Sequence, residues 1–234
     1  MKIKKSGITA SGLKYIAIIA MLIDHIAYLF VREPIIYCCM RFIGRTTAPV
    51  MCFFISEGYH HTRNLKKYFQ RMGVFAIVSH FTFAYCFDSE KSSIITTLFL
   101  SLSAVHIVNT DKIKKEFVLP VIVFICTVAK RCDWGSEAVM YTLAFELARG
   151  NRKNQVIAYG LTASIFKVCP LILATIQDVS SITVQWYRLG ILIPIPLLLL
   201  YNGEKGGRKY TKWVFYVFYP IHLLILGAIH HAIS

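Results

Sequence analysis

The chain has 234 residues, 56% of them hydrophobic, and a formal net charge of +14. Its mean hydropathy of +0.56 is higher than that of ordinary soluble domains. The lysines and arginines fall in short clusters between apolar runs, which argues against a nucleic-acid partner, since a nucleic-acid binder gathers them on one solvated face. These properties predict a polytopic membrane protein, with residues 1–234 forming a single integral membrane domain.

Apolar runs long enough to cross about 30 Å of hydrocarbon predict an all-α bundle of about nine transmembrane helices. In chain order, the expected spans are 13–31, 35–58, 67–87, 93–110, 117–130, 136–149, 155–177, 183–201 and 212–232. The fifth and sixth are short enough to be re-entrant or interfacial, so eight or ten spans are alternatives. The basic N-terminus has no small-x-small cleavage site behind its apolar run, so we expect it to be retained.

Basic residues are distributed unevenly between the two sides of this predicted bundle. The N-terminus and the alternate loops contain most of the 26 lysines and arginines, whereas the opposite loops are rich in acids. By the positive-inside rule, the N-terminus is expected in the cytoplasm and the C-terminus outside. We therefore expect a multi-pass membrane protein.

Two ionisable residues, Asp24 and His25, interrupt the first apolar run, MLIDHIAYLF. At a rise of 1.5 Å per residue they lie about 16–18 Å along the first span, near the bilayer centre. Ionisable residues at this depth usually face an interior cavity or one another, so they are functional candidates. The others inside predicted spans are Arg41, Arg45, Glu57, His80, Glu146, Lys167, Arg188 and His222.

The second span contains Arg41 and Arg45, whose i, i+4 spacing places them on one helix face. Gly44 and Pro49 predict a kink and a close helix approach. Asp24 is the nearest anion in sequence, and we expect it to face an arginine rather than the neighbouring histidine, because adjacent helix positions diverge by about 100°. The pair could simply lock two helices together, but a second arginine would then remain for a phosphate or carbonyl.

A polar, cationic rim follows at the expected cytoplasmic end of this span. Glu57 is spaced i, i+4 from His61, and the residues that follow are Thr62, Arg63, Asn64, Lys66 and Lys67. Positive-inside anchoring explains the lysines, whereas an anionic, phosphate-bearing ligand from the cytosol explains the whole group. The eight histidines include no HExxH motif, and we expect no metal site.

Four pieces of sequence in a fixed order resemble the TraX family of membrane proteins. They are SGLKYIAIIAMLIDHIAYLF, MRFIGRTTAPVMCFFISEGYHHTRNLKKYFQRMGVFAIVSH, CDWGSEAVM and VFYVFYPIHLLIL, between residues 11 and 226. The most specific signature is the ordered set of DH in the first span, RxxGR in the second and EGxxHTRN at its end. The resemblance departs at His60, where the family usually has another residue, and after His80, where FTFAYCFDS replaces an expected proline-containing turn.

The resemblance implies an acetyltransferase that takes acetyl-CoA on the cytosolic face, since the family's namesake is an N-acetylase of pilin. By motif position, the expected catalytic residues are His25 as base, with Asp24, Arg41 and Arg45. The expected acetyl-CoA-binding residues are Glu57, His61, Thr62, Arg63, Asn64, Lys66 and Lys67. Further candidates are His80 and His222. The acceptor is left open as an amine, or a hydroxyl, on a peptide, a protein or a small molecule, approached within the lipid bilayer or from either face.

Acetyl transfer needs a base for the nucleophile's proton and a stabiliser for the oxyanion, and a histidine with nearby arginines could supply both. Buried Asp, His and Arg residues are equally suited to a proton-coupled transporter or channel, which is the main alternative function. A passive assembly factor is a third. Only the acetyltransferase should be stabilised by CoA.

Overall fold

The computed structural model describes residues 6–178, 185–207 and 211–233, and this part of the chain is helical with two isolated β-bridges and no strand. The prediction of an all-α protein is confirmed. The chain forms two compact units: the first unit comprises residues 1–50 and 150–218, and the second unit comprises residues 51–149 and 219–234. The expectation of a single integral domain stays a prediction.

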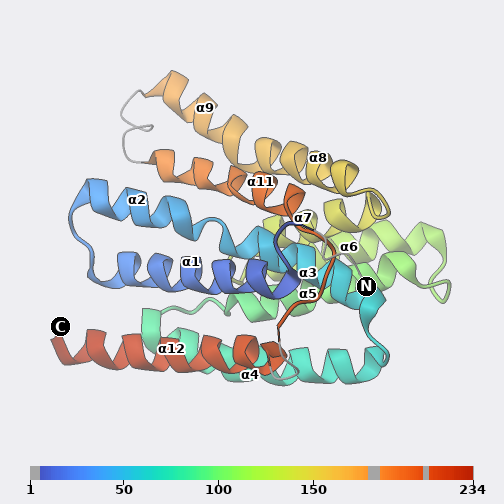
Figure 1. Cartoon of the computed structure of the whole chain (residues 1–234), viewed down its shortest axis with the longest axis horizontal. Helices are drawn as coiled ribbons and strands as arrows, with labels where there is room; N and C mark the ends of the chain where they lie inside the picture. Colours follow the sequence, from blue (N-terminus) through green and yellow to red (C-terminus); the bar gives the residue numbers. More distant parts are fainter. Residues whose placement is uncertain (1–5, 179–184, 208–210, 234) are drawn as a thin grey trace. The chain divides into compact units, whose positions relative to one another are not determined.

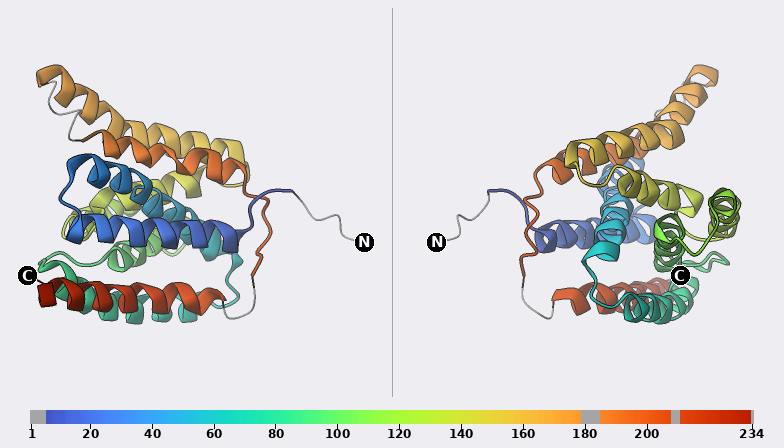
Figure 2. Two further views of the ribbon diagram at one scale, coloured as in Figure 1. Left: turned by 60° about the vertical axis from the view of Figure 1, so that its left-hand side comes forward. Right: turned by 90° about the vertical axis from the view of Figure 1, so that its right-hand side faces the viewer.

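The first unit contains two groups of packed helices (Figure 1). Its elements are α1 (Ala10–Phe30), α2 (Pro34–Gly44), the start of α3 (Thr47–His61), α8 (Arg152–Ala163), the π-helix η1 (Ser164–Val168), α9 (Cys169–Gln177), the 3-10 helix η2 (Trp186–Leu192) and α11 (Pro194–Leu199). α1 packs against α2, η2 packs against α2, and α11 packs against α8. In Figure 2, α8 and α9 form one helical path through η1.

The predicted second span is two helices in the structure, with a break at residues 45–46. α2 begins with Pro34, whose fixed φ suits the first helical turn. Pro49 lies in the first turn of α3, where its missing N–H removes no helical hydrogen bond. Thr47 Oγ1 donates to the Ala17 carbonyl of α1 at 3.0 Å and anchors the new helix. The kink expected from Gly44 and Pro49 is confirmed.

The second unit is organised around α5 (Ile94–Asn109). This helix packs against α4 (Leu65–Phe87), α6 (Lys115–Ala129) and α7 (Gly135–Leu147). The remaining element is α12 (Thr211–Ile233), which, like α3, contains a boundary between the units. Near the end of α12, a ring nitrogen of His231 lies 2.9 Å from the carbonyl oxygen of Tyr85 on α4.

Four helical stretches in the described residues are long and apolar enough to cross a membrane: Ala10–Phe30, Pro34–His61, Arg152–Gln177 and Tyr216–Ile233. Each of the nine predicted ranges overlaps a helix, although residues 183–184 of the eighth lie outside the described residues. Several large apolar side chains are exposed, as a lipid-facing surface requires, for example Phe81 (67%) and Ile176 (76%). These features fit a helical membrane protein, while the sides of the two termini stay predictions.

Candidate functional site

Asp24 of α1 binds two arginines: Arg41 in α2 and Arg45, which is the C-terminal cap of that helix. Arg41 Nη1 donates to Asp24 Oδ2 at 2.6 Å, and Arg45 Nη2 lies 3.1 Å from each of the two carboxylate oxygens. The expectation that Asp24 faces an arginine is therefore confirmed, and one carboxylate serves two guanidinium groups. We call Asp24, Arg41 and Arg45 the arginine cluster.

The three side chains of the arginine cluster sum to one positive charge. Its side chains are only 12% exposed for Asp24, 13% for Arg41 and 15% for Arg45. Buried guanidinium groups favour a nearby anion or the negative oxygen of a polarised carbonyl. Among the described residues, Arg41 Nε is buried without a hydrogen-bond partner, which leaves one donor available.

Two glycines permit the close approaches that build this cluster. A Cβ atom at Gly44 would overlap the carboxylate of Asp24, so only glycine lets α2 lie this close to α1. A Cβ atom at Gly190 of η2 would likewise overlap the carbonyl oxygen of Phe42. The glycine of the RxxGR motif therefore has a structural role, because it makes room for Asp24, which binds both arginines of the motif.

Three tyrosines surround the guanidinium group of Arg41. Its central carbon lies 5.5 Å from the ring centroid of Tyr28, 5.8 Å from that of Tyr37 and 5.7 Å from that of Tyr187. Arg45 also lies 5.8 Å from the Tyr187 ring. Cation–π contacts of this kind hold a cation in place without neutralising it. Sequence analysis singled out neighbouring Arg188 and missed Tyr187, because an aromatic residue in an apolar run carries no distinctive signal.

His25 is buried on α1 beside Asp24 in sequence, with 8% of its surface exposed. It follows Asp24 in sequence, on a helix position that diverges from that of the carboxylate by about 100°. Its catalytic role stays a prediction.

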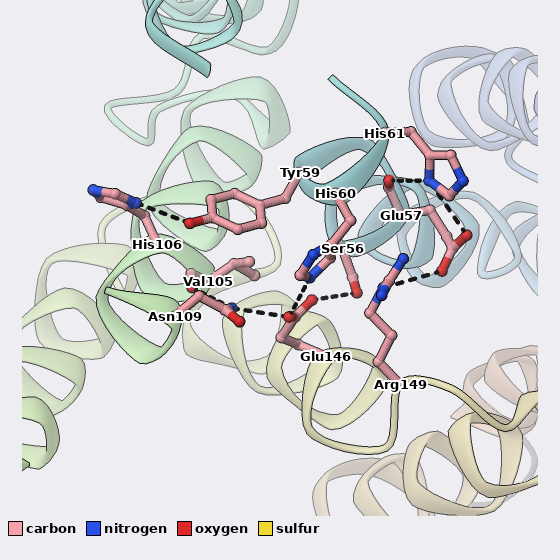
Figure 3. Close-up of polar contacts among 10 residues, drawn as sticks. All are labelled: Ser56, Glu57, Tyr59, His60, His61, Val105, His106, Asn109, Glu146 and Arg149. Carbon is pink, nitrogen blue, oxygen red and sulfur yellow. Dashed lines mark hydrogen bonds and ion pairs between the residues drawn. The ribbon is translucent and has the colours of Figure 1, made fainter. Parts of the chain in front are cut away.

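A second polar cluster lies in the second unit, around Glu146 of α7 (Figure 3). Ser56 Oγ donates to Glu146 Oε2 at 2.6 Å, and Asn109 Nδ2 donates to Oε1 at 2.9 Å. Nε2 of His60 lies 2.6 Å from the same Oε1 atom. Glu146 was among the ionisable residues that the sequence placed within spans, but its three partners were not among the predicted site residues. We call these four residues the Glu146 cluster.

The predicted cationic rim begins directly after this cluster. Glu57 Oε1 lies 3.9 Å from Arg149 Nε, and Glu57 Oε2 lies 3.8 Å from His61 Nδ1. His61 Nδ1 is also 2.8 Å from the Glu57 carbonyl oxygen (Figure 3). Because Glu57 already faces a histidine and an arginine, its carboxylate helps to order the rim.

The rest of the rim forms the turn between α3 and α4. Asn64 caps α4 by accepting a hydrogen bond from the Lys67 backbone at 2.9 Å, and Thr62 Oγ1 lies 3.4 Å from the Asn64 carbonyl oxygen. Arg63, Lys66 and Lys67 are exposed. The structure therefore brings these predicted residues together as one cationic turn at a helix N-terminus, which favours anions.

The two further candidates lie elsewhere in the second unit. His80 of α4 has a buried Nδ1 atom with no hydrogen-bond partner among the described residues. His222 of α12 is 5% exposed, and its ring packs edge-on against Tyr219 at 5.5 Å. A functional role for either histidine stays a prediction.

Comparison with known proteins agrees with the resemblance seen in the motifs. The sequence pattern of the family described as "TraX protein" matches residues 9–230. A protein of Dichelobacter nodosus described as "Probable fimbrial assembly protein FimC, serogroup H1" is 34% identical over 240 residues, which cover 93% of this chain and 94% of that protein. No solved structure matches the chain. The chain therefore belongs to the TraX family.

Proposed function

We propose that this protein is a membrane-embedded acetyltransferase that moves the acetyl group of cytosolic acetyl-CoA to an amine, or a hydroxyl, of an acceptor. The observation that carries the proposal is the buried arginine cluster, whose Asp24 precedes the buried His25 in sequence, in a chain that belongs to the TraX family. A net positive site next to a histidine has the two groups that acyl transfer needs: an oxyanion stabiliser and a base.

In the proposed reaction, His25 takes a proton from the acceptor nitrogen as that nitrogen attacks the thioester carbonyl. The carbon–nitrogen bond forms, the carbon–sulfur bond breaks, and the proton passes from His25 to the leaving thiolate, so that His25 ends neutral. Arg41 or Arg45 stabilises the negative charge on the carbonyl oxygen, which the excess charge of the cluster favours. Asp24 holds both guanidinium groups in position.

The cationic rim is proposed to bind the phosphates of acetyl-CoA. Arg63, Lys66 and Lys67 are exposed beside the N-terminus of α4, where side-chain charge and backbone N–H groups both attract phosphate. His61, Thr62 and Asn64 add hydrogen-bonding groups, and Glu57 orders His61 and Arg149.

The acceptor is proposed to be an amine of a peptide, a protein or a small molecule. The relative's description as a fimbrial assembly protein favours a protein among these. The setting is proposed to be the bacterial cytoplasmic membrane, crossed about nine times with the N-terminus in the cytoplasm, because most basic residues fall on that side. In this orientation the rim faces the cytosolic supply of acetyl-CoA.

Donor binding is the first experiment, and it needs no knowledge of the acceptor. The thermal midpoint of the detergent-solubilised protein is measured with acetyl-CoA, CoA or ATP, each over a concentration series. A specific ligand raises the midpoint, by a free energy of about 2.7 kcal/mol at 100 times its Kd. We expect acetyl-CoA and CoA to stabilise the protein and ATP not to do so. Folded protein that gains nothing from CoA would overturn the proposal and favour a proton-coupled transporter.

Substitutions in the cationic rim test whether it is the site that binds CoA. The triple variant Arg63→Ala, Lys66→Ala, Lys67→Ala should lose most of the stabilisation by CoA. The matched control removes Lys112, Lys114 and Lys115, three exposed lysines from the same unit, and should keep it. His25→Ala should bind CoA like the natural protein, since its proposed role is in the chemistry. Equal losses in both triple variants would show that net charge alone attracts the ligand.

A further inference from the structure

The Glu146 cluster has a hydrogen-bond pattern that determines which nitrogen of His60 is the base. Glu146 is 5% exposed, and an ionised carboxylate can only accept hydrogen bonds. Ser56 Oγ–H and Asn109 Nδ2–H occupy one oxygen each as donors. His60 Nε2 lies 2.6 Å from Glu146 Oε1, so an ionised Glu146 requires the hydrogen on Nε2 and leaves the lone pair of the neutral ring on Nδ1.

Glu146 is also the charged group nearest to the His60 ring among the contacts of this cluster. In the described part of the chain, its hydrogen-bond partners are a hydroxyl, an amide and an imidazole, so no arginine or lysine neutralises it there. An imidazolium at His60 would form a buried ion pair with this carboxylate, and the side chain of His60 is still 25% exposed. Asn109 is itself fixed by a second hydrogen bond, from Nδ2 to the Val105 carbonyl at 2.8 Å.

We propose that His60 and Glu146 form a second proton-transfer site, in which Nδ1 of His60 takes a proton from a primary ammonium group. This inference rests on the proposed function, because an amine acceptor is protonated at neutral pH and is a nucleophile only after it loses that proton. The step converts R–NH3+ and neutral His60 into R–NH2 and imidazolium, which Glu146 stabilises. Glu146 is a positioning residue.

Other titratable groups surround this site on every helix packed around it. They are Glu57, Tyr59 and His61 of α3, Tyr68 of α4 next to Gly58, His106 of α5, and Arg149 after α7. Tyr59 connects two of the histidines, since its hydroxyl lies 3.1 Å from His106 Nδ1 and its ring packs edge-on against His60 at 5.0 Å. The carboxylate of Glu57 faces Arg149 and His61 rather than His60 (Figure 3).

The first test reads the protonated nitrogen directly and needs no activity. The protein is labelled with nitrogen-15 histidine, solubilised in detergent and studied by NMR, and the His60 signals are assigned by their loss in His60→Gln. We expect hydrogen on Nε2 and a bare Nδ1 at neutral pH. In Glu146→Gln, His60 should become a mixture of tautomers. The matched control is Glu57→Gln, which removes the nearby carboxylate that faces His61 instead and should leave the His60 signals unchanged.

The second test is the pH profile of acetyl transfer to a primary amine. His60→Gln should lower the rate at neutral pH by about 100-fold, the lower limit for a general base. The loss should shrink as pH rises, because the amine then deprotonates without help, whereas His25→Ala should stay inactive. A merely structural role for His60 would lower the rate equally at every pH and would overturn the proposal.

The two tests separate the failure of this inference from that of the proposed function. Hydrogen on Nδ1 in the natural protein, or no tautomer change in Glu146→Gln, would overturn the His60 site even if acetyl-CoA binds. If CoA does not stabilise the protein, the acetyltransferase proposal fails, and with it the ammonium as substrate. The NMR result would still decide whether His60 is held as a base.

Discussion

Asp24 in the first unit and Glu146 in the second are both buried carboxylates, but their partners differ in charge. Asp24 binds two arginines, whose charge is permanent, so the arginine cluster keeps an excess of one positive charge. Glu146 binds a serine, an asparagine and a histidine, of which only the histidine can gain a charge. The first arrangement attracts a negative group, while the second accepts a proton. The same kind of acid therefore serves two different chemical purposes.

The largest effect expected from this difference is that of Asp24→Asn. The substitution keeps the shape of the side chain but removes the carboxylate that both buried arginines bind. Breaking a buried ion pair in this way costs about 3–5 kcal/mol. Unfolding by SDS in mixed micelles measures the free energy of unfolding of the variant and of the natural protein.

The matched control is Arg45→Gln, which leaves one arginine for one carboxylate and a neutral cluster. Arg45→Gln should lower the free energy of unfolding clearly less than Asp24→Asn does, although it removes one interaction of the same acid. If the two variants lose equal stability, the arginine cluster has no excess charge that matters, and the contrast with Glu146 disappears.

Gly44→Ala should have the next largest effect, because its Cβ atom would overlap the Asp24 carboxylate. Overpacking a buried contact costs about 1–3 kcal/mol, and this overlap lies in a helix contact that cannot expand without losing both ion pairs. The same SDS titration measures the loss.

Gly160→Ala in α8 is the control for helix propensity. There the new Cβ atom meets only Ile195 Cδ1, at an ordinary 3.5 Å, so the substitution should be neutral or stabilising. A loss at Gly160 as large as that at Gly44 would mean that glycine is needed in these helices for a reason other than the approach of Asp24.

The arginine cluster could be predicted from sequence because its parts are close along the chain. Asp24 and Arg41 are 17 residues apart on consecutive helices, and the i, i+4 spacing of the arginines fixes a shared face. The positions of the helices were also predictable, since each predicted range overlaps a helix among the described residues. Even the break at residues 45–46 could be expected from Gly44 and Pro49.

The Glu146 cluster could not be predicted in the same way, because its partners come from distant helices. Ser56 and Asn109 are 90 and 37 residues away in sequence. Which helices pack together depends on side-chain fit within the bundle, and an apolar run carries little information about its neighbours. The i, i+4 spacing of Ser56 and His60 was visible, but nothing in the sequence connected that face to Glu146.

Glu146→Gln should have a smaller effect than Asp24→Asn. The new glutamine side chain would have the same size, but its amide N–H would meet groups that already donate hydrogen bonds to this position. An unsatisfied buried donor costs about 1–3 kcal/mol, and no permanent charge is left without its partner. Measured beside Asp24→Asn, the difference between the two isosteric changes gives the effect of permanent charge directly. A cost equal to that of Asp24→Asn would mean that His60 is already positively charged.

The smallest effect is expected at Tyr187, whose ring contacts both Arg41 and Arg45 without forming an ion pair. Tyr187→Leu removes the aromatic face and should cost about 1 kcal/mol, as expected for partly desolvated cation–π contacts. Tyr187→Phe keeps the face and should be nearly neutral, so the two variants together separate the ring from the hydroxyl. If both lose the same stability in the SDS titration, the hydroxyl rather than the ring is responsible. The arginines would then be held mainly by Asp24, and the excess positive charge would be less constrained than the three tyrosines suggest.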